Sequence, residues 1–78
     1  MQVTFYAAAA DAAGVRAEAV DGPLSAAGLV ERLGSDRPAL ADVLARCSIL
    51  VDGRRVADPD LPLPADARVD VLPPFAGG

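Results

Sequence analysis

Histidine and tryptophan are absent from the 78 residues, and Cys47 is the only cysteine. Without histidine the chain lacks the base of Ser-His-Asp and Cys-His catalysis, and a zinc site would lack its usual ligands. A single cysteine cannot form an internal disulfide, and we interpret Cys47 as a buried thiol that packs as a small hydrophobic residue. The composition therefore predicts a domain with little equipment for catalysis of its own.

Lysine is also absent, so all seven basic residues are arginines. One interpretation is chemical, because no side-chain amine is then present to attack an activated acyl group on the protein. A coding bias toward arginine and alanine explains the same composition, and we favour that simpler explanation.

Positive charge and long apolar runs are both scarce. Eleven acidic residues against seven arginines give a formal charge of −4 and an isoelectric point near 4.4. This balance argues against nucleic acid or anionic lipid as partners, because both require clustered cations. The longest apolar run, residues 5–10, is much shorter than the ~20 residues that span a bilayer, and no basic segment precedes it as in a signal peptide. We therefore expect one soluble, cytoplasmic domain that binds neither nucleic acid nor membrane.

The first part of the chain predicts an antiparallel hairpin followed by a helix. Residues 2–8 and 15–19 show the alternation of strands that bury one face, and Asp11–Gly14 between them is predicted to be a turn. Ser25 is expected to cap a helix that ends at Gly34. Its apolar residues recur at the i, i+3, i+4 and i+7 spacing of one helical face, at Ala26, Leu29, Val30 and Leu33.

A second, shorter helix and a second hairpin follow. The helix is expected to begin with Asp36 as its cap and Pro38 in its first turn. Asp52-Gly53 lies between the apolar runs 48–51 and 54–57, and an Asp-Gly pair in that setting is the strongest hairpin signal in the chain.

Residues 58–67 are interpreted as an ordered crossing loop held by Leu61 and Leu63, and residues 69–71 as the last strand. The resulting order is strand, strand, helix, short helix, strand, strand, strand. It predicts an α+β fold of the β-grasp (ubiquitin-like) type, a mixed sheet crossed by one main helix plus a short helix. In that arrangement the first and last strands pair in parallel at the centre of the sheet.

Few internal residues are candidates for chemistry. Asp58 and Asp60 could form an acid–base pair or hold a metal, but a solvated loop is the favoured interpretation. Arg54 and Arg55 leave a hairpin turn and are interpreted as solvated charges, with a partner contact as the alternative. Glycine-rich phosphate loops are absent, so nucleotide binding by the chain itself is not expected.

The segment after the last strand differs from the rest. Pro73 and Pro74 fix φ and lack an N–H, so a strand ladder cannot continue through them. Gly77 and Gly78 have no side chains, which makes this end as thin as a peptide can be. We therefore predict a β-grasp domain over residues 1–72 and a flexible C-terminal Gly-Gly tail over residues 73–78. The tail would suit a narrow tunnel of another protein, with an ordinary frayed terminus as the alternative.

The tail, the length and the order of elements resemble the ubiquitin-like sulfur carriers of the MoaD/ThiS family, and most closely the small subunits of molybdopterin synthase. The resemblance covers essentially the whole chain. It rests on Val3-Thr4-Phe5-Tyr6-Ala7, Ala12-Ala13-Gly14, Val51-Asp52-Gly53 and Pro73-Pro74-Phe75-Ala76-Gly77-Gly78. Carriers of the thiamin pathway are usually shorter and typically lack the paired prolines. The chain departs from the family pattern at Asp66-Ala67, where Gly-Asp is frequent, and at Phe75, where an aliphatic residue is common.

The resemblance implies that the reactive group is the α-carboxylate of Gly78. An E1-like adenylating enzyme would use ATP to activate it, and a persulfide from a sulfurtransferase or cysteine desulfurase would convert it into a thiocarboxylate. The sulfur would then attack a precursor held by an acceptor enzyme, which in the closest case is the large subunit of molybdopterin synthase. The chain would be a carrier subunit, not catalytic alone, that binds no cofactor and no metal.

The other tail residues are expected to bind these partners, with the aromatic Phe75 as an anchor in a pocket. They are Pro73, Pro74, Phe75, Ala76 and Gly77. Packing of Phe75 back onto its own domain is the alternative.

Three other functions remain open. The same tail chemistry could serve the synthesis of thiamin, cysteine or a sulfur-containing natural product, with only the acceptor changed. A free Gly-Gly end would also allow the chain to modify proteins through an isopeptide bond, as ubiquitin does. Finally, the domain could be a non-covalent interaction module whose tail is incidental.

Overall fold

The computed structural model describes residues 1–74. Its main element is a five-stranded sheet in the order β2-β1-β7-β4-β5. The two central strands, β1 (Gln2–Phe5) and β7 (Arg68–Leu72), run parallel. The strands next to this pair are antiparallel to it: β2 (Ala17–Ala19) pairs with β1, and β4 (Ser48–Val51) pairs with β7. The edge strand β5 (Arg54–Arg55) pairs antiparallel with β4. The predicted β-grasp fold, with the first and last strands paired at the centre, is confirmed.

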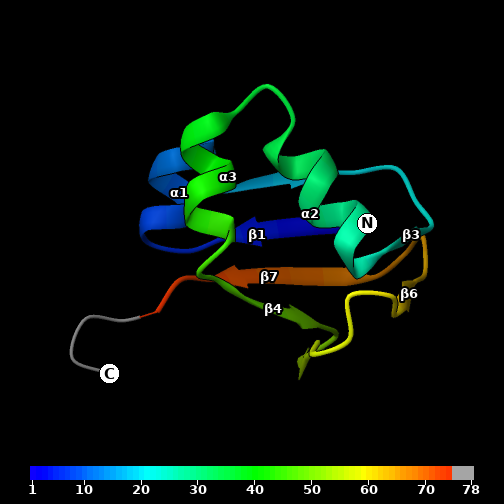
Figure 1. The fold of residues 1–78 in the computed structure, drawn as a ribbon. Helices are drawn as coiled ribbons and strands as arrows, with labels where there is room; N and C mark the ends of the chain where they lie inside the picture. The colour runs from blue at the N-terminus through cyan, green and yellow to red at the C-terminus, as the bar shows by residue number, and fades with distance from the viewer. Residues whose placement is uncertain (75–78) are drawn as a thin grey trace.

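Three helices lie on one face of this sheet (Figure 1). They are α1 (Ala8–Ala13), α2 (Ala26–Gly34) and α3 (Pro38–Leu44). A small second sheet pairs β3 (Leu24–Ser25) with β6 (Pro62–Leu63) and ties the start of α2 to the segment before β7.

The core lies between the helices and the two central strands. Alternate residues of these strands are buried, and Val3 lies opposite Val69 in the register. Leu29 and Leu33 of α2 and Leu40 of α3 are fully buried, so the apolar face predicted for the main helix is the one that packs. Ser25 caps that helix as expected, because its Oγ accepts a hydrogen bond from the N–H of Gly28 at 3.0 Å.

The first hairpin forms with a different connection from the predicted turn. Gln2 pairs with Ala19, but β1 ends at Phe5 and residues 8–13 form the helix α1. Alanine has the highest helix propensity of all residues and is depleted in strands. The alanines that follow β1 therefore form a helix instead of extending the strand. Gly14 then ends α1 in the left-handed region, at φ 78°.

Two smaller predictions are wrong. Arg37, not Asp36, occupies the cap position of α3, because Asp36 adopts a left-handed φ of 59° and its side chain makes no cap. Leu61 does not hold the crossing loop, since it is 40% exposed. Leu63 does, at 1% exposed, through the β6 pairing with β3 that the proline-rich sequence concealed.

Candidate functional site

The carboxyl end of β7 is held on both sides. β1 runs parallel to it, and Ser48 of β4 lies opposite Leu72 in the antiparallel register. Because parallel strands end at the same edge of a sheet, the chain leaves β7 beside the residues that follow β1. Figure 1 shows this edge lying beneath α1 and α3. The segment after Leu72 therefore starts from a fixed point of the fold.

The two prolines after β7 form the root of the predicted tail. Pro73 is buried and Pro74 is exposed. Together with Ala8, Val43 and Arg46 they line a small cavity of about 140 Å³ between α1, α3 and the end of β7. The four remaining residues assigned to partner binding and sulfur chemistry, Phe75, Ala76, Gly77 and Gly78, lie outside the described residues.

Tyr6 is the exposed aromatic residue beside this root. Its backbone N–H donates to the carbonyl of Val71 at 3.2 Å. This hydrogen bond joins the residue that follows β1 to the carboxyl end of β7. Its side chain is 41% exposed, and its hydroxyl donates to Oδ1 of Asp70 at 3.2 Å. Sequence analysis did not single out Tyr6 as a site residue. The available signal was its alternation with Phe5, which is 3% exposed and faces the core.

The negative charge of Asp70 raises the pKa of the Tyr6 hydroxyl, and desolvation and the hydrogen bond act in the same direction while Arg68 opposes them. The phenol is therefore neutral near pH 7 and can donate a hydrogen bond. This places an aromatic ring with a polar tip at the point where the chain leaves the sheet, a combination that is enriched at protein interfaces.

Replacing Asp70 by Asn is expected to lower the pKa of Tyr6 toward its ordinary value of about 10. In the protein without substitutions, the Tyr6 hydroxyl loses its proton at a lower pH in the unfolded state than in the folded state. The free energy of unfolding therefore falls as the pH rises through the folded-state pKa. Because Tyr6 is the only tyrosine and tryptophan is absent, tyrosinate absorbance in a pH titration reports this group alone. An unchanged titration midpoint in D70N would contradict the contact. R68Q, which removes a cation that lowers the pKa, should shift the midpoint the opposite way.

The other sequence candidates lie away from this root or are inert. The Cys47 thiol is half-buried and donates to the carbonyl of Val43 at 3.2 Å. Burial raises its pKa, against the smaller opposing effect of Arg46, so it is a thiol rather than a thiolate. Asp58 and Asp60 are exposed, and Oδ1 of Asp58 accepts the N–H of Asp60 at 2.9 Å, as in a solvated turn. Within residues 1–74 no group of three side chains is arranged to hold a metal ion.

Chemically, the root has no acid–base pair, and Cys47 is not activated as a nucleophile. The root fixes the point at which the tail leaves the sheet, and the exposed ring of Tyr6 beside it is available for contact with a partner. No helix among residues 1–74 is long and apolar enough to cross a membrane.

The parallel central pair, the crossing helices and the chain that leaves the central strand define a ubiquitin-like β-grasp domain. The chain belongs to the ThiS family, whose model matches residues 3–78. A search of curated proteins found no match.

Solved structures with the same fold come from archaea and bacteria. SAMP1 from Haloferax volcanii is 24% identical with a TM-score of 0.78, and the match covers 99% of this chain and 97% of that one. A protein from Pyrococcus furiosus, described as a proposed molybdopterin converting factor subunit 1, is 24% identical with a TM-score of 0.80 and 95% coverage of both chains. In a complex of subunits 1 and 2 of molybdopterin-converting factor from Helicobacter pylori, the similar chain is 18% identical, with a TM-score of 0.72 and coverage of 99% and 96%. These likenesses establish the fold.

Proposed function

We propose that this protein is a sulfur carrier that delivers sulfur as a thiocarboxylate on Gly78, in molybdopterin biosynthesis as the small subunit of a molybdopterin synthase. The observation that carries the proposal is the match to the ThiS family over residues 3–78, which includes the Ala76-Gly77-Gly78 end. The fixed root at β7 supports it, because a carrier must present its reactive end at a constant distance from the surface that its partners recognise.

The proposed chemistry takes place in partner proteins. Near pH 7 an α-carboxylate with a pKa of ~3.3–3.7 is an anion and a poor electrophile. An E1-like enzyme would join it to the α-phosphate of ATP, releasing pyrophosphate and leaving an acyl-adenylate. The terminal sulfur of a persulfide would attack the acyl carbon and expel AMP. A second thiol would then cleave the S–S bond, becoming oxidised to a disulfide and leaving the thiocarboxylate.

The domain's contribution is recognition and positioning. Holding the sulfur of a docked carrier next to a bound precursor raises its effective concentration without any acid–base group on the carrier. Pro74 of the root and the neighbouring Tyr6 are exposed and would contact the enzyme that receives the tail. The formal charge of −4 favours partners with a basic docking surface.

The assignment to molybdopterin rests on similar proteins. The Pyrococcus furiosus protein is described as a proposed subunit 1 of molybdopterin converting factor. The Helicobacter pylori structure is a complex of subunits 1 and 2 of that factor. The paired prolines after β7 favour this pathway over thiamin synthesis. A carrier for thiamin, cysteine or another sulfur compound would use the same tail with a different acceptor, so a binding assay with the large subunit of molybdopterin synthase separates these pathways.

Incubation with an activating enzyme, ATP and a sulfur source is expected to raise the intact mass by about 16 Da, the difference between sulfur and oxygen, as a covalent intermediate of this type requires. Omission of ATP is the control and should leave the mass unchanged. A protein that forms the adenylate but never gains the sulfur mass would not be a sulfur carrier.

Protein modification is the second candidate, because the similar SAMP1 structure is also described as small archaeal modifier protein 1. Activated Gly78 would then form an isopeptide with a lysine of a target. The absence of lysine from this chain means that it could not build chains on its own side chains. A ladder of larger conjugates on an immunoblot would support this function, and its absence under conditions that give the thiocarboxylate would exclude it.

A further inference from the structure

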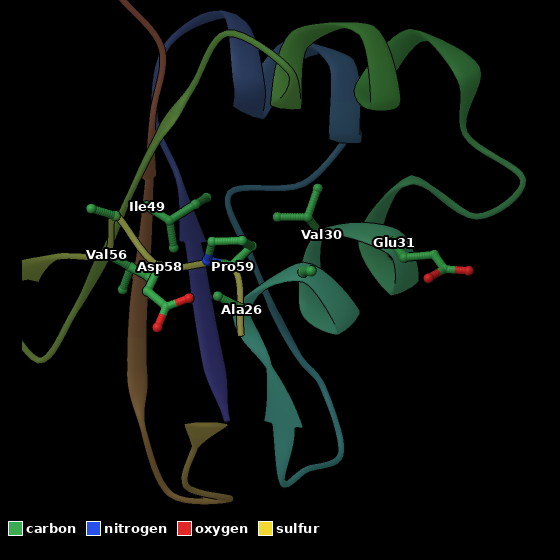
Figure 2. Close-up of a pocket in the computed structure, with 9 residues that line it drawn as sticks. Ala26, Val30, Glu31, Ile49, Val56, Asp58 and Pro59 are labelled. Carbon is green, nitrogen blue, oxygen red and sulfur yellow. The ribbon is translucent and has the colours of Figure 1, made fainter. Parts of the chain in front are cut away.

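A groove of about 440 Å³ lies between α2 and the hairpin side of the sheet, away from the root of the tail (Figure 2). One wall comes from the first turns of α2, and the other from β4 and the segment after β5. Seven of its nine lining residues are apolar and two are acidic. The nine are Ala26, Ala27, Val30, Glu31, Ile49, Val56, Ala57, Asp58 and Pro59.

Backbone hydrogen bonds fix the positions of the two walls of the groove. The N–H of Ala27 donates to the carbonyl of Pro59 at 2.8 Å, which attaches the start of α2 to the opposite wall. The N–H of Val56 donates to the carbonyl of Ile49 at 2.8 Å and fixes that wall to β4. Both alanines at the start of α2 are too small to fill the space, so Val30 and Ile49 stay only partly covered. The groove is therefore part of the folded structure.

The charges at the groove have one sign. Figure 2 shows Asp58 on the wall after β5, and Glu31 at the outer edge of the helix wall with its carboxylate directed away from the opposite wall. No arginine lines the groove. In the part of the chain that the structure describes, the single ion pair joins Arg37 to Glu18, so neither groove carboxylate is neutralised by a partner.

We propose that this groove binds an aliphatic segment of a partner protein that carries an arginine or lysine beside its apolar residues. The apolar lining would receive the aliphatic side chains, because removing such surface from water is favourable. The two carboxylates would pair with the flanking cations and set the direction and selectivity of docking.

This docking surface lies on the helix side of the sheet, whereas Tyr6 lies on the other face. Phe5 and Val71 are buried toward the helices, and the residues that alternate with them, Tyr6 and Asp70, meet through their side chains on the opposite face. A partner that holds the tail and Tyr6 would therefore leave the groove accessible to a second protein. The inference stands independently of the chemistry proposed for Gly78.

The test uses the full chain, isotope-labelled, and two synthetic peptides of equal length. One has the sequence Arg-Leu-Val-Leu-Arg and the other Glu-Leu-Val-Leu-Glu, both with blocked ends. Titration with the arginine peptide is expected to shift the amide signals of Ala27, Val30 and Ala57. The glutamate peptide is expected to bind about fivefold more weakly, as one exposed charge pair of ~1 kcal/mol implies.

Two exposed substitutions test the groove by different means. Ala27→Arg fills the space and adds a cation, while Asp58→Arg reverses the charge of one wall. Each should weaken binding of the arginine peptide by about fivefold. Asp42→Arg is the matched control, since Asp42 is exposed on α3 outside the groove and changes the net charge equally. Thermal unfolding of each variant verifies that it is folded.

Three outcomes would overturn the proposal. The first is that neither peptide shifts the groove amides. The second is that the two peptides bind equally, or that Asp42→Arg weakens binding as much as Asp58→Arg, which would make the attraction a property of net charge alone. The third is that the groove amides shift with protein concentration in the absence of peptide, because the occupant would then be a second copy of the chain.

Discussion

A variant with one alanine added after Gly78 is expected to lose thiocarboxylate formation completely while remaining folded. The addition converts the Gly78 carboxylate into a peptide carbonyl and moves the reactive end outward by about 3.3–3.6 Å. A misplacement of even ~1 Å at a reacting centre can cost on the order of a hundredfold in rate. The measurement is the gain of sulfur mass with activating enzyme, ATP and a sulfur source.

Gly78→Ala is the matched control, because it adds the same methyl group but keeps the chain length and the position of the carboxylate. It should be slower than the native chain and faster than the extended one. If the extended protein gained sulfur at the native rate, the reactive atom would not be the carboxylate of Gly78. Such a result would leave the fold and the ThiS family membership unaffected.

The central part of the fold could be predicted from the sequence because its signals are local. The Asp52-Gly53 pair specifies the second hairpin, and the i, i+4 spacing of Leu29 and Leu33 specifies the face of α2 that packs. Both agree with the final arrangement of the core, so local preference and tertiary packing indicate the same structure.

The predictions failed where two preferences competed or where the pattern was short. The alanines at 8–13 read as the end of a strand and a turn because they follow a strand pattern, but their helix propensity decided the outcome. β6 is two residues long and begins with Pro62, so no alternation was available to reveal it. Its pairing with β3 depends on the whole chain being folded.

The candidate site also combines features that the sequence could predict with features that only the folded chain reveals. The thin, glycine-ended tail follows from residue types. Its chemistry is implied by the family resemblance and stays a prediction, because Phe75–Gly78 lie outside the described residues. Tyr6, by contrast, acquires its significance from the parallel pairing of β1 with β7, which joins residues far apart in sequence. The groove depends on α2, β4 and the segment after β5 together, so no single motif could have indicated it.

Leu29→Ala is expected to have the largest effect on stability. Leu29 is fully buried in α2, in the layer between the helices and the central strands. Truncation of a buried leucine to alanine costs ~2.7–5 kcal/mol, because it removes apolar contacts and leaves a cavity. A domain of this length has a total stability of roughly 4–12 kcal/mol. The variant should therefore unfold at a much lower urea concentration than the native chain. Circular dichroism during a urea titration measures this midpoint.

Leu61→Ala is the control for this prediction, because it removes the same atoms from a side chain that is 40% exposed. Substitutions at exposed positions usually change stability by about 0.5 kcal/mol or less, so its midpoint should stay close to the native one. Equal midpoints for the two variants would mean that the packing of α2 on the central strands does not determine stability. In the expected case, L29A should also lose sulfur loading in proportion to the unfolded fraction, because the root at β7 depends on the same core.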